Sequence, residues 1–170
     1  IHLVRFKSVS PSSYDTNYVV GMRGASSILW GKYILKQEKK LRRPILAPVI
    51  DALMVNYDIR PYKIRTLCII VPMNEICDRL LTHFNSKGFS VGLYTSASAK
   101  KSNTKEIFNN QIVLTNSSMF SKGIDIPNLK WLINFTSVSS LISLEQVVGR
   151  LRGKESDKDD RVYIDCVDAS

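Results

Sequence analysis

Two short segments in the last third of the chain carry side chains suited to a phosphate-bearing ligand. In the first, Gly123 allows a tight turn of the backbone, and Asp125 can accept hydrogen bonds from a ribose hydroxyl or a neighbouring arginine. In the second, Gln146 precedes Arg150 by one helical turn, and Arg152 follows. Because a guanidinium is planar and permanently charged, it can bind phosphate oxygens in bidentate fashion. The two segments together predict a site that faces a nucleotide.

The order and spacing of these segments, SKGIDIP at 121–127 and QVVGRLR at 146–152, resemble motifs V and VI of the superfamily-2 helicases. The resemblance extends over roughly residues 46–167, and Thr66–Val71 with the loop after it is similar to motif IV. It implies an α/β fold, a RecA-like parallel sheet flanked by helices, which forms the C-terminal lobe of such motors. The phrase from Met119 to Leu129 looks closest to phage, viral and repair-associated DNA helicases.

The resemblance also implies roles for these residues. Arg150 would be the arginine finger on the γ-phosphate of ATP held by the other lobe, with Gln146 beside it, while Gly123 and Asp125 would line the nucleotide cleft. Gln146 can also be read as a surface polar residue. The family has a second arginine three residues after the first, where this chain has a glycine. Arg152 would face away from Arg150 on a continuous helix, so its role is open.

Contacts with the phosphates of a nucleic acid are implied for two loops. Motif V places small hydroxyl residues at Ser117 and Ser118, or at Thr115 if the alignment shifts by two residues. Hydroxyls beside lysines suit sequence-independent phosphate contacts in the loop after the strand that ends at Tyr94, a loop that can equally be read as merely solvated. The residues in that loop are Thr95, Ser96, Lys100 and Lys101.

The chain is not expected to bind Mg-ATP by itself. Gly24 followed by Gly31-Lys32 has the wrong spacing for a phosphate-binding P-loop, and Tyr33 stands where Ser or Thr would bind Mg²⁺. ATP and Mg²⁺ would be held mainly by the N-terminal RecA-like lobe of the same protein. The resemblance therefore implies an ATP-dependent helicase in the full-length protein and an inactive isolated fragment. The alternative is a RecA-like module that binds nucleic acid or protein without turnover.

Composition limits the other possibilities. With 24 Lys and Arg against 15 Asp and Glu, the formal charge of +9 favours nucleic acid as partner, and the resemblance implies DNA rather than RNA. Part of this charge lies in a basic cluster that is either a solvated helix end or a nucleic-acid contact: Lys36, Lys39, Lys40, Arg42 and Arg43. The three cysteines lie in apolar patterns and are expected to be reduced, and the two histidines predict no metal site. No signal peptide or membrane span is visible, which predicts a soluble, intracellular protein.

Strand and helix patterns alternate from about residue 43, as in stacked βα units. We expect residues 1–43 to be a lead-in with an edge strand, and residues 44–170 to form the RecA-like domain. The predicted strands are Leu3–Phe6, Thr66–Val71, Ser90–Tyr94, Gln111–Leu114, Trp131–Phe135 and Arg161–Cys166. The predicted helices are Arg43–Tyr57, one capped by Asn74 and ended by Gly88, Leu141–Leu151, and a weaker one around Ala25–Lys39.

Overall fold

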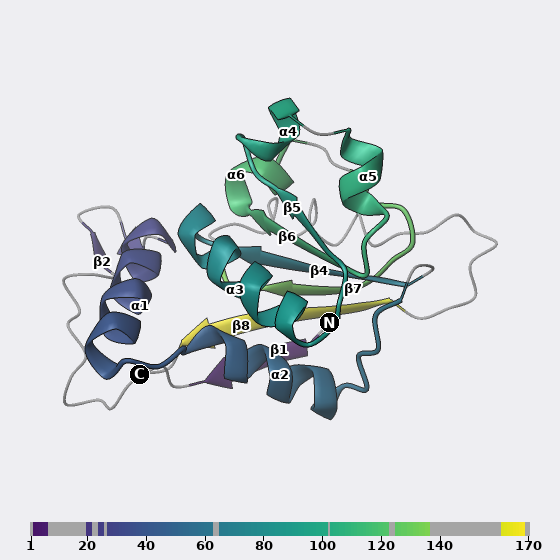
Figure 1. Ribbon diagram of the computed structural model, residues 1–170. Coiled ribbons are helices and arrows are strands. Elements are labelled where there is room, and N and C mark those ends of the chain that lie inside the picture. The colour runs from purple at the N-terminus through teal and green to yellow at the C-terminus, as the bar shows by residue number, and fades with distance from the viewer. Residues whose placement is uncertain are drawn as a thin grey trace.

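The computed structural model describes residues 2–6, 20–21, 24–25, 27–62, 65–101, 103–122, 125–136 and 161–168. Within these ranges the chain builds a six-stranded sheet of order β1-β8-β7-β4-β6-β5, in which all neighbouring strands are parallel (Figure 1). The strands are β1 (His2–Phe6), β4 (Thr66–Val71), β5 (Val91–Tyr94), β6 (Ile112–Asn116), β7 (Leu129–Asn134) and β8 (Val162–Asp168). The predicted parallel α/β sheet is confirmed, and β1 lies at an edge, as expected.

Helices cover both faces of this sheet. One face carries α1 (Ser27–Leu41), α2 (Leu46–Asn56) and α3 (Asn74–Ser86), and the other carries α5 (Thr104–Phe108) and α6 (Ser117–Phe120). The further elements are α4 (Ser98–Lys101) and an antiparallel pair, β2 (Val20–Gly21) with β3 (Gly24–Ala25). The central strand β4 is buried along its whole length, because alternate residues pack into the two helical layers.

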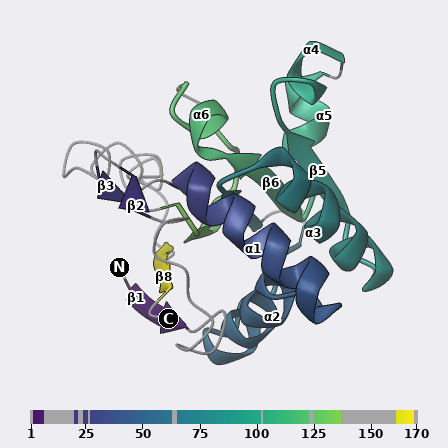
Figure 2. The same ribbon diagram turned by 90° about the vertical axis from the view of Figure 1, so that its left-hand side faces the viewer.

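Helix α1 is more firmly integrated than its weak sequence pattern indicates. Trp30, Tyr33 and Ile34 are buried in the same core as α2 and α3. A Cβ atom at Gly31 would lie 2.9 Å from the Met73 side chain and 3.0 Å from that of Pro72, so glycine allows α1 to pack closely against the loop after β4. Figure 2 shows α1 in front of that end of the sheet. Gly31 therefore serves helix packing within α1, in agreement with the rejection of a P-loop.

Of the two caps predicted for α3, the one at its C-terminus is confirmed and the one at its N-terminus is wrong. Gly88 has a φ of 83°, and the bond from the Phe89 N–H to the Phe84 carbonyl at 3.1 Å completes the predicted left-handed cap. The predicted cap at the other end is wrong, because Met73 occupies the N-cap position and makes no side-chain cap bond. Asn74 is the first residue of the helix, and its side chain turns to another strand end.

Other expectations fall partly outside the described ranges. The predicted helix Leu141–Leu151 lies outside them. Cys68, Cys77 and Cys166 are buried and free, as predicted. None of the helices in the described part of the chain combines the length and apolarity needed to cross a bilayer.

Candidate functional site

Three strand ends meet at one edge of the sheet and bring polar side chains together. Because all the strands are parallel, their carboxyl ends lie at the same edge. The register pairs Val71 with Asn116 and Tyr94 with Thr115, which sets the loops after β4, β6 and β5 side by side. We call this region the carboxyl edge; it contains the loop after β4, the segment from Asn116 to Phe120 and the loop that begins at Thr95.

Asn116 connects two of these loops. Its amide Nδ2 donates to Asn74 Oδ1 at 2.7 Å, while its Oδ1 accepts from the Met119 N–H at 2.9 Å and from the Ser118 hydroxyl at 2.8 Å. Asn116 is thus the N-cap of α6 and a bridge to the start of α3. The sequence reasoning did not single out Asn116, although an Asn three residues before an apolar pair is a recognisable cap signal.

The N-terminus of α3 adds a partial positive charge to this edge. Its N-cap residue Met73 makes no side-chain cap bond, although the Ile76 N–H donates to the Met73 carbonyl at 3.2 Å. Glu75 lies in the first turn, but its carboxylate is engaged by Arg79 at 2.9 Å. The helix end together with the Asn74–Asn116 pair offers donors to an anion.

The two threonines predicted to contact phosphates are internal to the fold. Thr95 is 3% exposed; its N–H donates to Ser98 Oγ at 2.7 Å, and its hydroxyl lies 3.2 Å from the same oxygen. Thr115 is fully buried, and its hydroxyl donates to the Tyr94 carbonyl at 2.8 Å. Both residues shape the loops at the carboxyl edge, and their contact with phosphate stays a prediction.

The remaining predicted residues divide into two groups. Ser96, Ser117, Ser118 and Lys100 are exposed at or beside the carboxyl edge, and Lys101 ends α4. Asp125 is also exposed. The other four, Gly123, Gln146, Arg150 and Arg152, lie outside the described residues, so their roles stay predictions.

A polar network that the sequence did not reveal lies where β7 and β8 run side by side. Asn134 is 1% exposed and donates to the Tyr163 hydroxyl and to Asp165 Oδ1, both at 3.1 Å. Asn134 Oδ1 accepts from the Thr136 hydroxyl at 2.6 Å. Burial raises the pKa of Asp165, although hydrogen bonds from Tyr163 and Asn134 oppose this rise. The network holds a carboxylate on the α5–α6 face of the sheet.

Nothing in the described residues forms a metal centre. They contain no group of three or more His, Cys, Asp or Glu side chains able to hold a metal ion. They also provide no helix that follows a P-loop, since Gly31 and Lys32 lie inside α1. The expectation that ATP and Mg²⁺ are held mainly by another lobe stays a prediction.

Comparison with known proteins gives a family match and fold relatives. The family described as Helicase conserved C-terminal domain matches residues 50–153, a range that contains the motif IV, V and VI segments. No curated protein matches the chain.

Solved structures show the fold. The C-terminal part of the Fun30 ATPase domain superposes with a TM-score of 0.54 at 9% identity, over 73% of this chain and 40% of that one. The E. coli DEAD-box protein SrmB, bound to regulator of ribonuclease activity A, superposes with a TM-score of 0.53 at 19% sequence identity, over 69% of each chain. The Pyrococcus furiosus Hef helicase domain superposes with a TM-score of 0.50 at 14% sequence identity, over 79% of this chain and 28% of that one. The chain thus spans less than half of the Fun30 and Hef structures, and the predicted RecA-like fold is confirmed.

Proposed function

This chain belongs to the family of helicase conserved C-terminal domains, and on that premise we propose that it is the second RecA-like lobe of an ATP-dependent helicase or translocase. In this proposal the carboxyl edge contacts the phosphates of a nucleic-acid strand. The observation that carries it is the meeting of the motif IV and motif V loops through the 2.7 Å Asn74–Asn116 hydrogen bond. Donors on neutral side chains and a helix start suit phosphate contacts that do not depend on base sequence.

In this proposal the nucleotide site is formed jointly by this chain and the N-terminal RecA-like lobe. ATP with Mg²⁺, when bound there, supplies the phosphate-transfer chemistry, and this chain contributes charge and hydrogen bonds at the facing surface. Arg150 and Gln146 are the groups proposed to act on the nucleotide, with Gly123 and Asp125 beside it. An arginine finger contributes about 10³–10⁵ in rate in systems where its effect has been dissected.

Steady-state ATPase assays of the full-length protein test this proposal. Arg150→Ala should abolish nucleic-acid-stimulated turnover, whereas Arg60→Ala should leave it unchanged, since Arg60 is exposed and forms an ion pair at 2.7 Å with Asp58, which is exposed as well. Turnover that survives Arg150→Ala would remove the arginine-finger role. Parallel assays with DNA and RNA test the proposed DNA preference, which rests on the resemblance of the Met119–Leu129 segment to DNA helicases.

A second candidate function is a RecA-like module that binds nucleic acid or protein without turnover. The observation that favours it is the position of Arg152, two residues after Arg150 rather than three. The same assay separates the two functions, because a wild-type protein that binds nucleic acid yet hydrolyses no ATP would fit only the module.

A further inference from the structure

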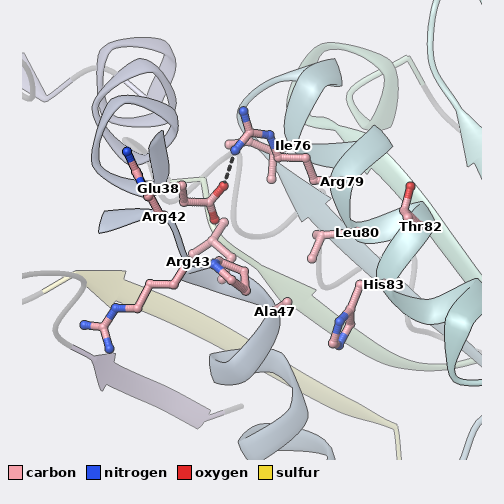
Figure 3. Close-up of a pocket in the computed structure, with 11 residues that line it drawn as sticks. Glu38, Arg42, Arg43, Ala47, Ile76, Arg79, Leu80, Thr82 and His83 are labelled. Carbon is pink, nitrogen blue, oxygen red and sulfur yellow. Dashed lines mark hydrogen bonds and ion pairs between the residues drawn. The ribbon is translucent and has the colours of Figure 1, made fainter. Parts of the chain in front are cut away.

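A pocket of about 500 Å³ opens where the end of α1, the α1–α2 junction and α3 meet. Figure 3 shows Arg42 and Arg43 on the α1 side, His83 on the α3 side, and Ala47 between them. The α1 side of the pocket lies at residues 38–47, before the family match begins at residue 50. This pocket is therefore built partly by a segment that does not define the family.

The bottom of the pocket is aliphatic. Leu46, Ala47, Ile76 and Leu80 line it and are each at most 4% exposed. Exposed Pro44 extends this apolar surface to the rim. A small apolar side chain placed here would bury hydrocarbon surface on both sides of the contact.

Most charges in the wall already have counter-charges. Arg79 Nη1 lies 2.7 Å from Glu38 Oε2, and Glu38 Oε1 also accepts from the Ile45 N–H at 2.8 Å. His83 Nε2 lies 3.1 Å from Asp51 Oδ2. Within the described residues the Glu38–Arg79 pair therefore leaves little net charge in this wall.

Arg42 and Arg43 differ from these wall residues. Both are exposed, and no carboxylate of the described residues forms an ion pair with either. They follow Lys39 and Lys40 in the last turn of α1, so the rim of the pocket is positively charged, and within the described part of the chain no ion pair offsets Arg42 or Arg43. Such a rim attracts carboxylates.

The backbone at Arg42 provides a second observation. Its φ is 51°, in the left-handed region, and the Arg43 N–H donates to the Glu38 carbonyl at 3.3 Å. Helix α3 ends with the same geometry but has Gly88 at the equivalent position, with a φ of 83°. Glycine is the residue that this conformation favours, so the chain carries an arginine there at a conformational cost. Non-glycine residues held in this region are concentrated at ligand-binding positions.

We propose that this pocket docks an acidic segment of a protein, with an apolar side chain over Pro44 and Ala47 and carboxylates at Arg42 and Arg43. A nucleic-acid strand fits less well, because it carries a charge at every nucleotide and its bases stack on aromatic platforms. The pocket floor is aliphatic, and its wall includes the Glu38 carboxylate. A peptide can set an uncharged side chain next to Glu38 and its acidic residues at the rim.

Fluorescence anisotropy with the 170-residue chain tests this assignment. The probe is a short fluorescein-labelled peptide in which one Phe is flanked by Asp and Glu. We expect saturable binding that Arg42→Gly and Thr82→Glu each weaken by about tenfold, the effect of one charge-assisted contact. Lys105→Ala, an exposed charge removal on α5, is the control and should bind as the wild type does.

Arg42→Gly is informative because glycine suits the backbone at this position, so loss of binding cannot be attributed to an unfolded chain. Thermal melting should show this variant to be at least as stable as the wild type. The assignment is overturned if no saturable binding occurs, if a peptide with Ser in place of Phe binds equally, or if Lys105→Ala weakens binding as much. It is also overturned if a single-stranded oligonucleotide displaces the peptide and loses affinity with Arg42→Gly.

Discussion

Replacing Asn116 with Asp tests whether the paired amides at the carboxyl edge face a phosphate chain. Asp retains an oxygen that can accept from the Met119 N–H and the Ser118 hydroxyl, now at 2.9 and 2.8 Å, so α6 should begin as before. The substitution removes the amide that donates to Asn74 at 2.7 Å and adds a negative charge at that point. It therefore changes the electrostatics of the edge while the fold is kept.

The expected magnitudes follow from these contacts. Loss of one exposed hydrogen bond should lower the free energy of unfolding by about 0.5–1 kcal/mol. A unit charge about 4 Å from a phosphate costs about 1 kcal/mol in water and more where water is partly excluded. Together with the lost donor, we expect the free energy of nucleic-acid binding to weaken by about 1.4 kcal/mol or more, which is at least about tenfold in Kd.

Fluorescence anisotropy with labelled single-stranded DNA and RNA at several salt concentrations measures this effect. Asn85→Asp is the matched control, because it makes the same change at an exposed position near the opposite end of α3. Equal affinity of wild type and Asn116→Asp, or an equal loss in Asn85→Asp, would refute the placement of a phosphate beside Asn116. A loss confined to Asn116→Asp that shrinks as salt rises would support it.

Two further predictions concern the scaffold. A Cβ at Gly92 would lie 2.1 Å from the Ile107 carbonyl oxygen. Gly92→Ala should therefore lower the free energy of unfolding, measured by urea titration, by about 2–4 kcal/mol. An unchanged urea midpoint would show that α5 shifts freely on β5. Burial alone would raise the pKa of Asp51, but hydrogen bonds from Lys87 and His83 outweigh it and lower that pKa below 3.8. Above about pH 4 the wild type should therefore have a higher free energy of unfolding than Asp51→Asn, and this difference should vanish as the pH falls through the lowered pKa of Asp51. A difference that persists in acid would contradict an origin in the ion pairs of Asp51.

The strands of the sheet were predictable because burial leaves a strong local pattern. Thr66–Val71 is a strand whose residues from Leu67 onward form a continuous apolar run, and it is the central strand with both faces covered. Gly88 was equally legible, since the end of an amphipathic helix followed by glycine predicts a left-handed cap. In these cases the neighbouring residues alone decide the conformation.

Long-range contacts explain what the sequence concealed. Helix α1 has a weak pattern of its own, and it is held by burial of Trp30 and Tyr33 against elements distant in the chain. The Asn74 side chain was expected to cap its own helix, but it pairs instead with Asn116, a residue 42 positions away. Spacing along one segment cannot show which of two possible partners a short polar side chain will choose.

Helix α3 contributes residues both to the carboxyl edge and to the pocket at the end of α1, and this bears on where the chain divides into parts. The expected division at residues 43 and 44 stays a prediction, yet Glu38 and Arg79 join α1 to α3 at 2.7 Å across that boundary. Helix α3 starts at the carboxyl edge with Asn74 and lines the pocket with Arg79. The segment before residue 44 therefore pairs with the same helix whose first residue lies at the carboxyl edge. The two surfaces differ in the residues that each exposes, although both include residues of α3.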